Sequence, residues 1–300
     1  MANDSYRGMD LPWWEFRASG RKNSYQGTRG SFFIGFATKD SSPAYLSKIR
    51  RKFPFLFQKR VRLERSGSQL SDGEIHYLYW FTQGSIMVPD IRHGLRKAWG
   101  FCERHAWGYI LVEAAFCRGY MHGASLLYED LLTPALSISR IRTPLQNWRL
   151  ARDLRNRGPC PMCKMGFGPH SKGIASPELI KRGRAITELG KLAGSTETYW
   201  EKTICGRCAK NGSAQRCRRH LIEDASKGLI DTLSTHHALV EYIFYHLSRY
   251  HRSFQLEFQG KQTDEDVAAL ISAVGWCSGW GAFLSICATE SEGKNVAIQW

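Results

Sequence analysis

Four pairs of potential metal ligands share one spacing in this chain of 300 residues. Two residues separate the members of each pair, and we number these dyads in chain order: Cys102/His105, Cys160/Cys163, Cys205/Cys208 and Cys217/His220. A two-residue spacer lets a tight turn or a helix start present both side chains to one ion, at about 2.0–2.3 Å for zinc. The four dyads supply the ligands of two tetrahedral sites, so the sequence predicts one or two zinc ions.

The spacing leaves the pairing of the dyads open. The third and fourth dyads together read C-x2-C-x8-C-x2-H, a compact finger that can close locally and leaves the first and second dyads for a long-range site. Alternatively, the second dyad binds with the fourth and the first with the third. In a further interpretation the first dyad, on a helix, has a packing role only. An iron–sulfur cluster is an alternative to zinc, although three cysteines and one histidine more often indicate zinc.

The remaining cysteines predict a reducing compartment rather than a disulfide scaffold. Nine cysteines in 300 residues are an odd number and too few for a disulfide-stapled fold. Cys117, Cys277 and Cys287 lie in apolar surroundings, which favours packed core thiols. The first residues, MANDSYRGMDLPWWEF, contain no apolar run and predict no signal peptide. We therefore expect a cytoplasmic protein.

Several segments carry a family resemblance. They are GFCERHAWGYILVEAAFCRGYMHGASLLYEDLL at Gly100–Leu132, CPMC at Cys160–Cys163 with the later fourth dyad, and the stretch Glu241–Gly275. Over residues 74–275 the chain resembles a group of uncharacterised bacterial helical proteins, which combine CPxC knuckles with a later G-x-C-x-x-H helix, twice per chain. The resemblance implies a helical fold and bound metal but no activity.

The chain departs from that family pattern at two points. No CPxC precedes Cys102, and the third dyad is additional. If the added dyad replaces the missing knuckle, the resemblance favours the pairing of first with third and second with fourth.

Helical patterns must position these ligands. Periodic apolar residues begin near Glu74, Pro89 is suited to the first position of a helix, and Thr263 precedes three acidic residues that favour a helix start. We expect a helical stretch over Cys102–Leu131, interrupted by Gly108, Gly119 and Gly123, and further helices at Pro177–Leu192, Glu197–Lys210, Arg216–Leu229 and Thr235–Tyr250. The predicted fold is mainly α, a zinc-stabilised multi-helix domain.

The first 70 residues differ from this helical part. They carry 14 Lys and Arg against five acidic residues, a surplus of +9, and glycines break them into short pieces. SFFIGF at Ser31–Phe36 could form a short strand. We predict an irregular basic, aromatic-rich N-terminal arm or small subdomain at residues 1–73, and a helical metal-binding domain at 74–300.

The charge predicts an acidic partner. Lys and Arg number 42 against 27 Asp and Glu, which gives +15. The arm interleaves basic and aromatic residues, a composition suited to phosphate contacts and base stacking, and arginines rim the Cys/His segments. We predict a non-catalytic nucleic-acid-binding subunit, for DNA or RNA, in a larger bacterial assembly of protein subunits. The expected phosphate contacts are Arg51, Lys52, Arg60, Arg62, Arg152, Arg155, Arg218 and Arg219.

Two other functional classes compete with nucleic-acid binding. The basic surface could meet an acidic protein, which defines a zinc-stabilised protein-interaction subunit. A metal-dependent or redox enzyme has less support, because the chain contains no G-x-x-x-x-G-K-[ST], G-x-S-x-G, H-E-x-x-H or dinucleotide motif. We therefore assign no catalytic residue.

One uncharged run raises the question of a membrane span. Val267–Thr289 is long enough to cross a bilayer, but its serines and glycines lower its hydrophobicity. Gly275 and Gly279 have the GxxxG spacing that serves close helix packing in lipid and in soluble cores alike. We predict a buried closing helix and no membrane partner.

Overall fold

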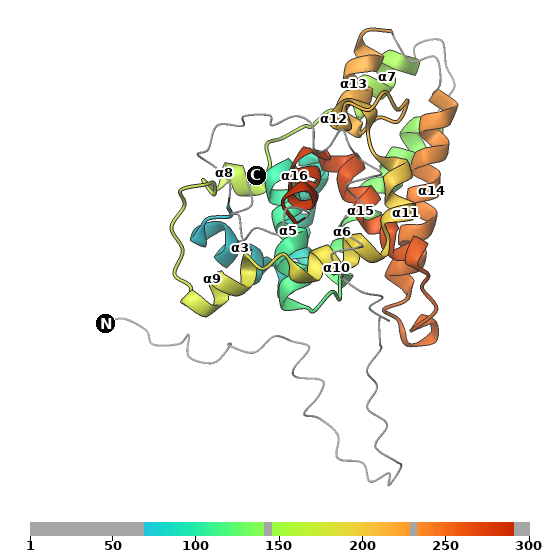
Figure 1. The fold of residues 1–300 in the computed structure, drawn as a ribbon. Helices are drawn as coiled ribbons and strands as arrows, with labels where there is room; N and C mark the ends of the chain where they lie inside the picture. Colours follow the sequence, from blue (N-terminus) through green and yellow to red (C-terminus); the bar gives the residue numbers. More distant parts are fainter. Residues whose placement is uncertain (1–68, 141–145, 229–232, 291–300) are drawn as a thin grey trace. The chain divides into compact units, whose positions relative to one another are not determined.

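The computed structural model describes residues 69–140, 146–228 and 233–290. Within these ranges every regular element is a helix and no strand occurs (Figure 1), so the prediction of a mainly α fold is confirmed. The predicted arm up to residue 68, with the expected strand at Ser31–Phe36, lies outside the described residues.

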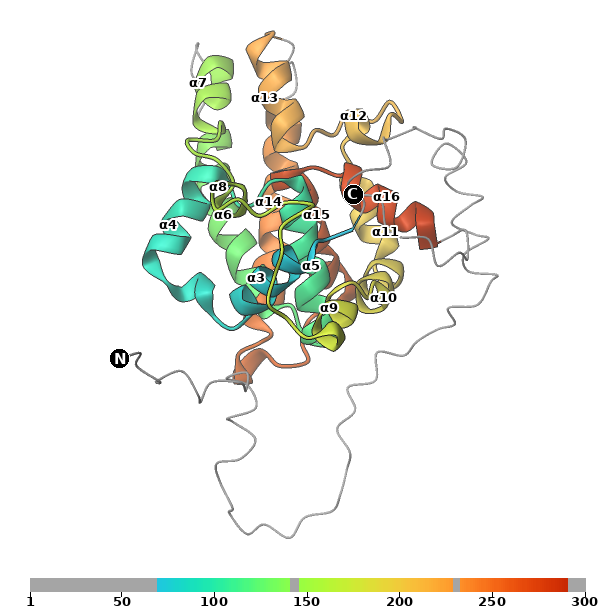
Figure 2. The same ribbon diagram turned by 90° about the vertical axis from the view of Figure 1, so that its left-hand side faces the viewer.

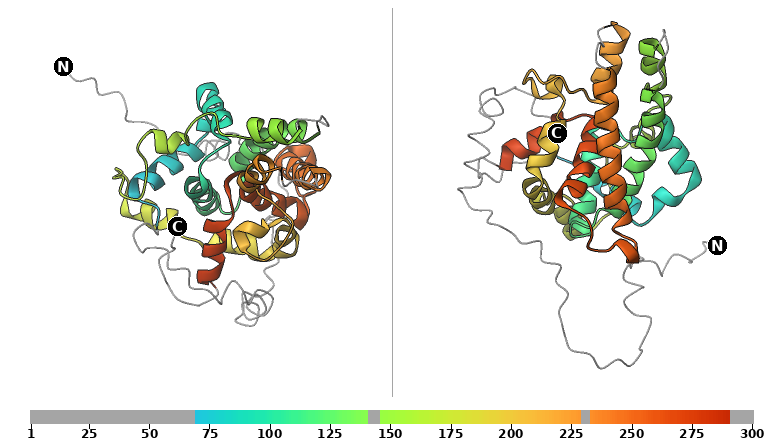
Figure 3. Two further views of the ribbon diagram at one scale, coloured as in Figure 1. Left: turned by 90° about the horizontal axis from the view of Figure 1, so that it is seen from above. Right: turned by 90° about the vertical axis from the view of Figure 1, so that its right-hand side faces the viewer.

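The described helices follow one another along the chain, with η marking 3-10 turns. They are α3 (Asp72–Thr82), η1 (Ser85–Met87), α4 (Pro89–Ala98), α5 (Glu103–Phe116), α6 (His122–Arg140), α7 (Gln146–Asp153), α8 (Pro161–Lys164), α9 (Pro177–Gly183), α10 (Thr187–Ser195), α11 (Glu197–Trp200), η2 (Glu201–Thr203), α12 (Gly206–Ala209), α13 (Arg218–Ser226), α14 (Leu233–Arg252), η3 (Leu256–Phe258), α15 (Asp264–Ser278) and α16 (Gly281–Glu290). The long orange helix in the right view of Figure 3 is α14, which packs against α6 and α15.

Two helices, α5 and α15, form the centre of the core. Apolar residues occur all around α5, as expected for a helix that neighbours cover on every side. Helices α3, α9, α10 and α16 pack around α5, while α6, α11 and α14 pack against α15. Trp107 of α5 stacks on Phe283 of α16 with ring centroids 4.5 Å apart, and its indole N–H donates to the Gly279 carbonyl at 2.8 Å. These contacts join the C-terminal helices to the helix that carries the first dyad.

The GxxxG spacing serves this core. A Cβ on Gly275 would lie 2.2 Å from the buried indole of Trp280, so the ring packs directly on the backbone of α15. Gly279 has φ +116° and ends that helix, and α16 begins two residues later. The expected single closing helix is therefore two helices. None of the described helices combines the length and the apolar character that a membrane span requires.

Several predicted boundaries are confirmed. Pro89 begins α4, and Thr263 caps α15 in a reciprocal capping box with Asp266. Gly119, with φ +81°, lies in the break between α5 and α6. Gly108 instead lies inside α5, where the absence of a side chain admits Leu70.

The single helices expected at Pro177–Leu192 and Glu197–Lys210 are wrong. The first divides into α9 and α10, with Arg184 in the break between them. The Arg184 guanidinium donates to the Leu70 carbonyl and to the Asp72 carboxylate. The second divides into α11, η2 and α12, because the chain restarts a helix at Cys205 to place the third dyad.

Candidate metal centres

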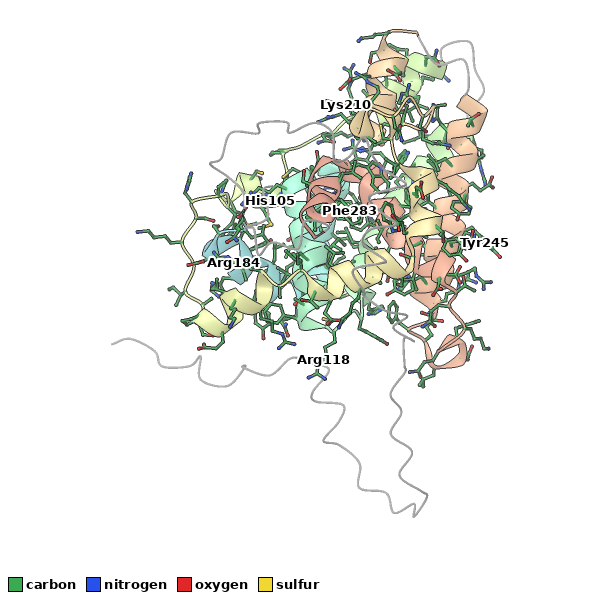
Figure 4. All side chains as sticks on the ribbon, in the orientation of Figure 1. His105, Arg118, Arg184, Lys210, Tyr245 and Phe283 are labelled. Atoms are coloured by element: carbon green, nitrogen blue, oxygen red, sulfur yellow. The ribbon has the colours of Figure 1, made fainter. Side chains whose placement is uncertain are left out.

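The first and second dyads meet in one cluster, which we call centre 1. The Nδ1 atom of His105 lies 3.2 Å from the Cys102 sulfur, 3.5 Å from that of Cys160 and 3.4 Å from that of Cys163. The Cys102 and Cys163 sulfurs are 3.7 Å apart, and all four ligand atoms lie within 4.8 Å of one another. In Figure 4 the label of His105 marks this cluster.

The third and fourth dyads form a second cluster, centre 2. The Nδ1 atom of His220 lies 3.2 Å from the Cys205 sulfur, 3.4 Å from that of Cys208 and 3.3 Å from that of Cys217. The Cys208 and Cys217 sulfurs are 3.8 Å apart. Lys210, labelled in Figure 4, lies in the loop between the two dyads of this cluster.

Both clusters have the dimensions of a tetrahedral zinc site. Bond lengths of about 2.3 Å to sulfur and about 2.05 Å to nitrogen require separations of ~3.8 Å between sulfurs and ~3.6 Å between sulfur and nitrogen. The sulfur pairs at 3.7 and 3.8 Å agree with this value and are too far apart for disulfides. The sulfur–nitrogen distances of 3.2–3.5 Å are slightly shorter than the tetrahedral value. Three cysteines and one histidine at these distances fit zinc binding.

The pairing of first with third and second with fourth dyad, which the resemblance favoured, is wrong. The turn between the third and fourth dyads explains the local closure. Gly206 donates its amide to the Gln215 carbonyl at 2.9 Å, and a Cβ on Gly206 would lie 2.0 Å from the Ser213 carbonyl oxygen. Lys210 and Gly212 have φ values of +55° and +75° and reverse the chain. The finger therefore closes on itself.

The two centres are built in the same way from helix starts. In each, one dyad occupies the N-cap and third positions of a one-turn helix: Cys160 and Cys163 on α8, Cys205 and Cys208 on α12. The cysteine of the other dyad caps a longer helix, α5 or α13, and its histidine takes the third position. N-cap and third residues point toward the same end of a helix, which is the physical reason for the two-residue spacer.

The thiol pKa values respond to this crowding. Hydrogen bonding from Cys102 lowers the pKa of Cys160 to about 3, and hydrogen bonding from Cys208 holds the pKa of Cys205 far below its usual range. The partner thiols keep their protons, so the hydrogen bonds to Cys160 and Cys205 raise the pKa values of Cys102 and Cys217. Ionising all three thiols of a centre would place three thiolates in mutual repulsion, which a dication between them would remove.

A buried carboxylate binds the ring nitrogen of His105 that faces away from the sulfurs of centre 1. The Glu74 side chain is fully buried, and its Oε1 lies 2.9 Å from Nε2 of His105. It also accepts from the Arg104 guanidinium at 2.7 and 2.8 Å and from the Ser71 amide at 2.7 Å. Burial by itself raises the pKa of Glu74, but the hydrogen bonds from Arg104, His105 and Ser71 outweigh it and bring the pKa to about 2. The carboxylate therefore stays ionised and favours the N–H on Nε2, which leaves Nδ1, the atom that faces the three sulfurs, as the candidate metal ligand.

The sequence interpretation missed Glu74 as part of the site. The S-x-x-E pattern of Ser71 and Glu74 was a signal for a capping box, and the structure contains that box at the start of α3. It gave no sign of His105, which lies 31 residues further along the chain. The loop after the second dyad holds this helix start in place, because Gly73 donates to the Ser171 carbonyl at 3.0 Å.

Centre 2 has different surroundings. The Nε2 atom of His220 lies 3.4 Å from the Arg219 guanidinium. Arg207 and Arg216, which rim the finger, both pair with Asp224 at 2.8 and 2.7 Å. Glu223 also pairs with Arg207 at 2.7 Å, so two carboxylates neutralise the charge of these two arginines.

The predicted phosphate contacts have three different outcomes. Arg51, Lys52, Arg60 and Arg62 lie outside the described residues. Arg152, Arg155 and Arg219 are exposed, and Arg155 reaches the Ser226 hydroxyl at 3.2 Å.

Arg218 is a correction to the predicted phosphate contacts. Its side chain is buried, and it donates to the carbonyls of Leu154 and Cys277 at 2.7 and 3.0 Å and to the Asn156 amide oxygen at 2.8 Å. The guanidinium also lies 5.3 Å above the Trp99 ring. Arg218 therefore joins α13 to the segment before the second dyad and to α15, and it cannot contact phosphate.

Of the three predicted core thiols, Cys277 is fully buried, while Cys117 and Cys287 are half-buried. Burial raises the pKa of both Cys117 and Cys277 to about 12, so these thiols stay protonated. They lie outside both centres.

Fold and site together define a helical protein with two separate Cys3His centres. Comparison of the chain with known protein families, with characterised proteins and with solved structures finds no match. The functional conclusion therefore rests on the residues described above.

Proposed function

We propose that the protein is a zinc-stabilised, non-catalytic nucleic-acid-binding subunit of a larger bacterial assembly, related to the helical proteins that it resembles in sequence. Zinc in both centres would fix the helix starts that carry the ligands, and structural zinc of this kind contributes on the order of 10 kcal/mol to folding. The four-ligand geometry favours a structural over a catalytic role, because a catalytic zinc keeps one position open.

One observation carries the nucleic-acid part of the proposal. Helix α7 buries Leu150 and Ala151 against the protein and leaves an arginine-rich face outside. The exposed arginines of this segment, which we call the α7 face, are Arg149, Arg152, Arg155 and Arg157. Figure 2 shows α7 and the neighbouring α13 side by side, in agreement with their packing.

The charge of the α7 face is poorly balanced within its segment. Asp153 is the single acidic residue between positions 146 and 157, and its partner is Arg152 at 2.7 Å. Lys97 lies next to this segment, because its carbonyl accepts from the Arg157 amide at 2.7 Å, and its side chain is also exposed. Guanidinium groups held on a packed helix can bind phosphates with little loss of side-chain freedom.

The test is binding of a fluorescently labelled DNA duplex and a labelled single strand, followed by anisotropy while the salt concentration rises. We expect log K to fall with log salt by about 0.9 for each neutralised phosphate on the duplex. The double variant Arg152→Glu/Arg155→Glu should lower the affinity and reduce this slope by about 1 for each contact removed.

The matched control is Lys172→Glu/Lys181→Glu, which reverses two exposed charges near and on α9, away from α7. It changes the net charge by the same amount and should leave the slope unchanged. Equal effects of the two double variants, or no binding at low salt, would overturn the proposal and favour an acidic protein as the partner of the basic surface.

A further inference from the structure

An exposed tryptophan lies in the middle of the α7 face. Trp148 is 59% exposed, although tryptophan is normally among the more buried residues of a folded protein. The guanidinium of Arg152 lies 4.9 Å from the centroid of its ring. No other aromatic ring contacts Trp148 in the part of the chain that the structure describes, so one face of the indole carries a cation and the other has no ring partner.

We infer that Trp148 is a stacking platform for an unpaired base, and that the α7 face binds single-stranded rather than duplex nucleic acid. This inference rests on the proposed function and narrows it to one class of ligand. An indole beside arginines suits a single strand, because the bases of a duplex are already stacked on each other and present no free ring face. Arg149 and Arg155 are also exposed within seven residues of Trp148 and can take the neighbouring phosphates.

The local packing holds this platform in place. Leu150 and Leu154 are buried beneath the helix, and the Leu154 carbonyl accepts from buried Arg218 at 2.7 Å. The guanidinium of Arg152 is fixed in turn by Asp153 at 2.7 and 3.1 Å. A ring and cation that are already ordered lose little freedom on binding a base, which favours affinity.

The decisive probe separates bases from phosphates. We would compare labelled oligothymidylate with an abasic strand of the same length, which has the same phosphates and no bases to stack. Stacking of one base on an aromatic side chain corresponds to about a 5- to 150-fold difference in affinity. Oligothymidylate should therefore bind more tightly than the abasic strand by about this factor, and Trp148→Ala should abolish the difference, while Trp148→Phe should retain most of it.

Tyr245 on α14 provides a matched control. It is 57% exposed and also carries an arginine, Arg249, at 5.8 Å from its ring. In Figure 4 it points outward from that helix. Tyr245→Ala removes a comparable exposed aromatic ring outside the α7 face and should leave the affinity for both strands unchanged.

The outcomes distinguish this inference from the proposed function. If oligothymidylate and the abasic strand bind equally well with a steep salt dependence, the inference is overturned while phosphate binding stands. Tighter binding of a duplex than of oligothymidylate would also overturn it. If neither strand binds at low salt, both proposals fail, and an acidic protein that docks on Trp148 and its arginines becomes the alternative.

Discussion

Glu74→Gln should weaken zinc binding at centre 1 and leave centre 2 intact. The Glu74 carboxylate accepts four hydrogen bonds, from Ser71, from two nitrogens of Arg104 and from His105, at 2.7–2.9 Å. A glutamine keeps the shape but replaces one oxygen by an NH2 group, which then faces a donor. It also removes the negative charge that orients the imidazole of His105.

The expected size follows from the role of such outer partners. Loss of a carboxylate that orients a metal-bound histidine typically lowers metal affinity about 10- to 100-fold, which corresponds to roughly 1.4–2.8 kcal/mol. Glu74 lies at the high end of this range because it is fully buried and also binds Arg104. Its replacement removes the ion pair between Glu74 and that guanidinium.

The assay must resolve the two centres within one chain. Zinc-loaded protein is exposed to increasing chelator and then to a thiol-alkylating reagent, and peptide mass spectrometry reports the modification of each cysteine. In the Glu74→Gln variant, Cys102, Cys160 and Cys163 should become reactive at about 10- to 100-fold lower chelator strength. Cys205, Cys208 and Cys217 should keep their midpoint.

Arg219→Gln is the matched control, because it changes the side chain beside Nε2 of His220. Arg219 is exposed and is not a carboxylate, so its replacement should shift neither midpoint by more than about twofold. An unchanged midpoint for centre 1 in Glu74→Gln would refute the assigned role. Equal shifts at both centres would also refute it, since they would indicate general destabilisation.

Three further predictions concern stability. Gly275→Ala places a methyl group 2.2 Å from the buried indole of Trp280, so it should destabilise the fold by about 1–3 kcal/mol in urea unfolding. The control Gly168→Ala, which has no atom within contact distance of the new methyl group, should leave the stability unchanged. Equal effects of the two variants would contradict the packing of Trp280 on α15. Arg218→Met should cost about 3 kcal/mol, because two buried carbonyls and the Asn156 amide oxygen lose their donor. Exposed Arg219→Met should be nearly neutral. A neutral Arg218→Met would show that these bonds do not stabilise the protein. Burial raises the pKa of Glu113 to about 7 despite hydrogen bonds from Tyr109, Gly123 and Ala124, so this carboxyl binds its proton more tightly when folded and its contribution to stability falls as pH rises from about 4.5 through 7. The stability advantage of wild type over Glu113→Gln should shrink by about 3 kcal/mol between pH 4.5 and 8, and a constant difference would contradict it.

The sequence predicts the metal ligands better than their pairing. A two-residue spacer is a local property, and N-cap and third positions of a helix explain it at all four dyads. Pairing depends on which segments meet in space. At centre 2 the turn at Gly206 brings the third and fourth dyads together. Centre 1 instead joins ligands that are 61 residues apart, Cys102 and Cys163.

Charge read from the sequence was a poorer guide to surface chemistry. Arg218 and Arg219 are neighbours in a basic run, yet one is buried with three acceptors and the other is exposed. Successive residues on a helix point in directions about 100° apart, so composition alone could not separate them. Asp224 on α13 likewise pairs with Arg216, which lies just before that helix, at 2.7 Å.

Helix existence was predictable where capping residues marked it. Thr263 with its acidic first turn and Pro89 gave correct helix starts. The breaks inside the expected helices at Pro177–Leu192 and Glu197–Lys210 arise from tertiary contacts, namely the Arg184 bonds and the ligand position of Cys205, which no local pattern encodes.

The most direct test of the account is metal content combined with ligand identity. Protein purified under reducing conditions and reconstituted with zinc should contain two zinc ions per chain by elemental analysis, one for each centre. X-ray absorption should give an average shell of three sulfurs and one nitrogen around each ion. Fewer than two zinc ions per chain, a shell without nitrogen, or iron as the tightly bound metal would contradict it.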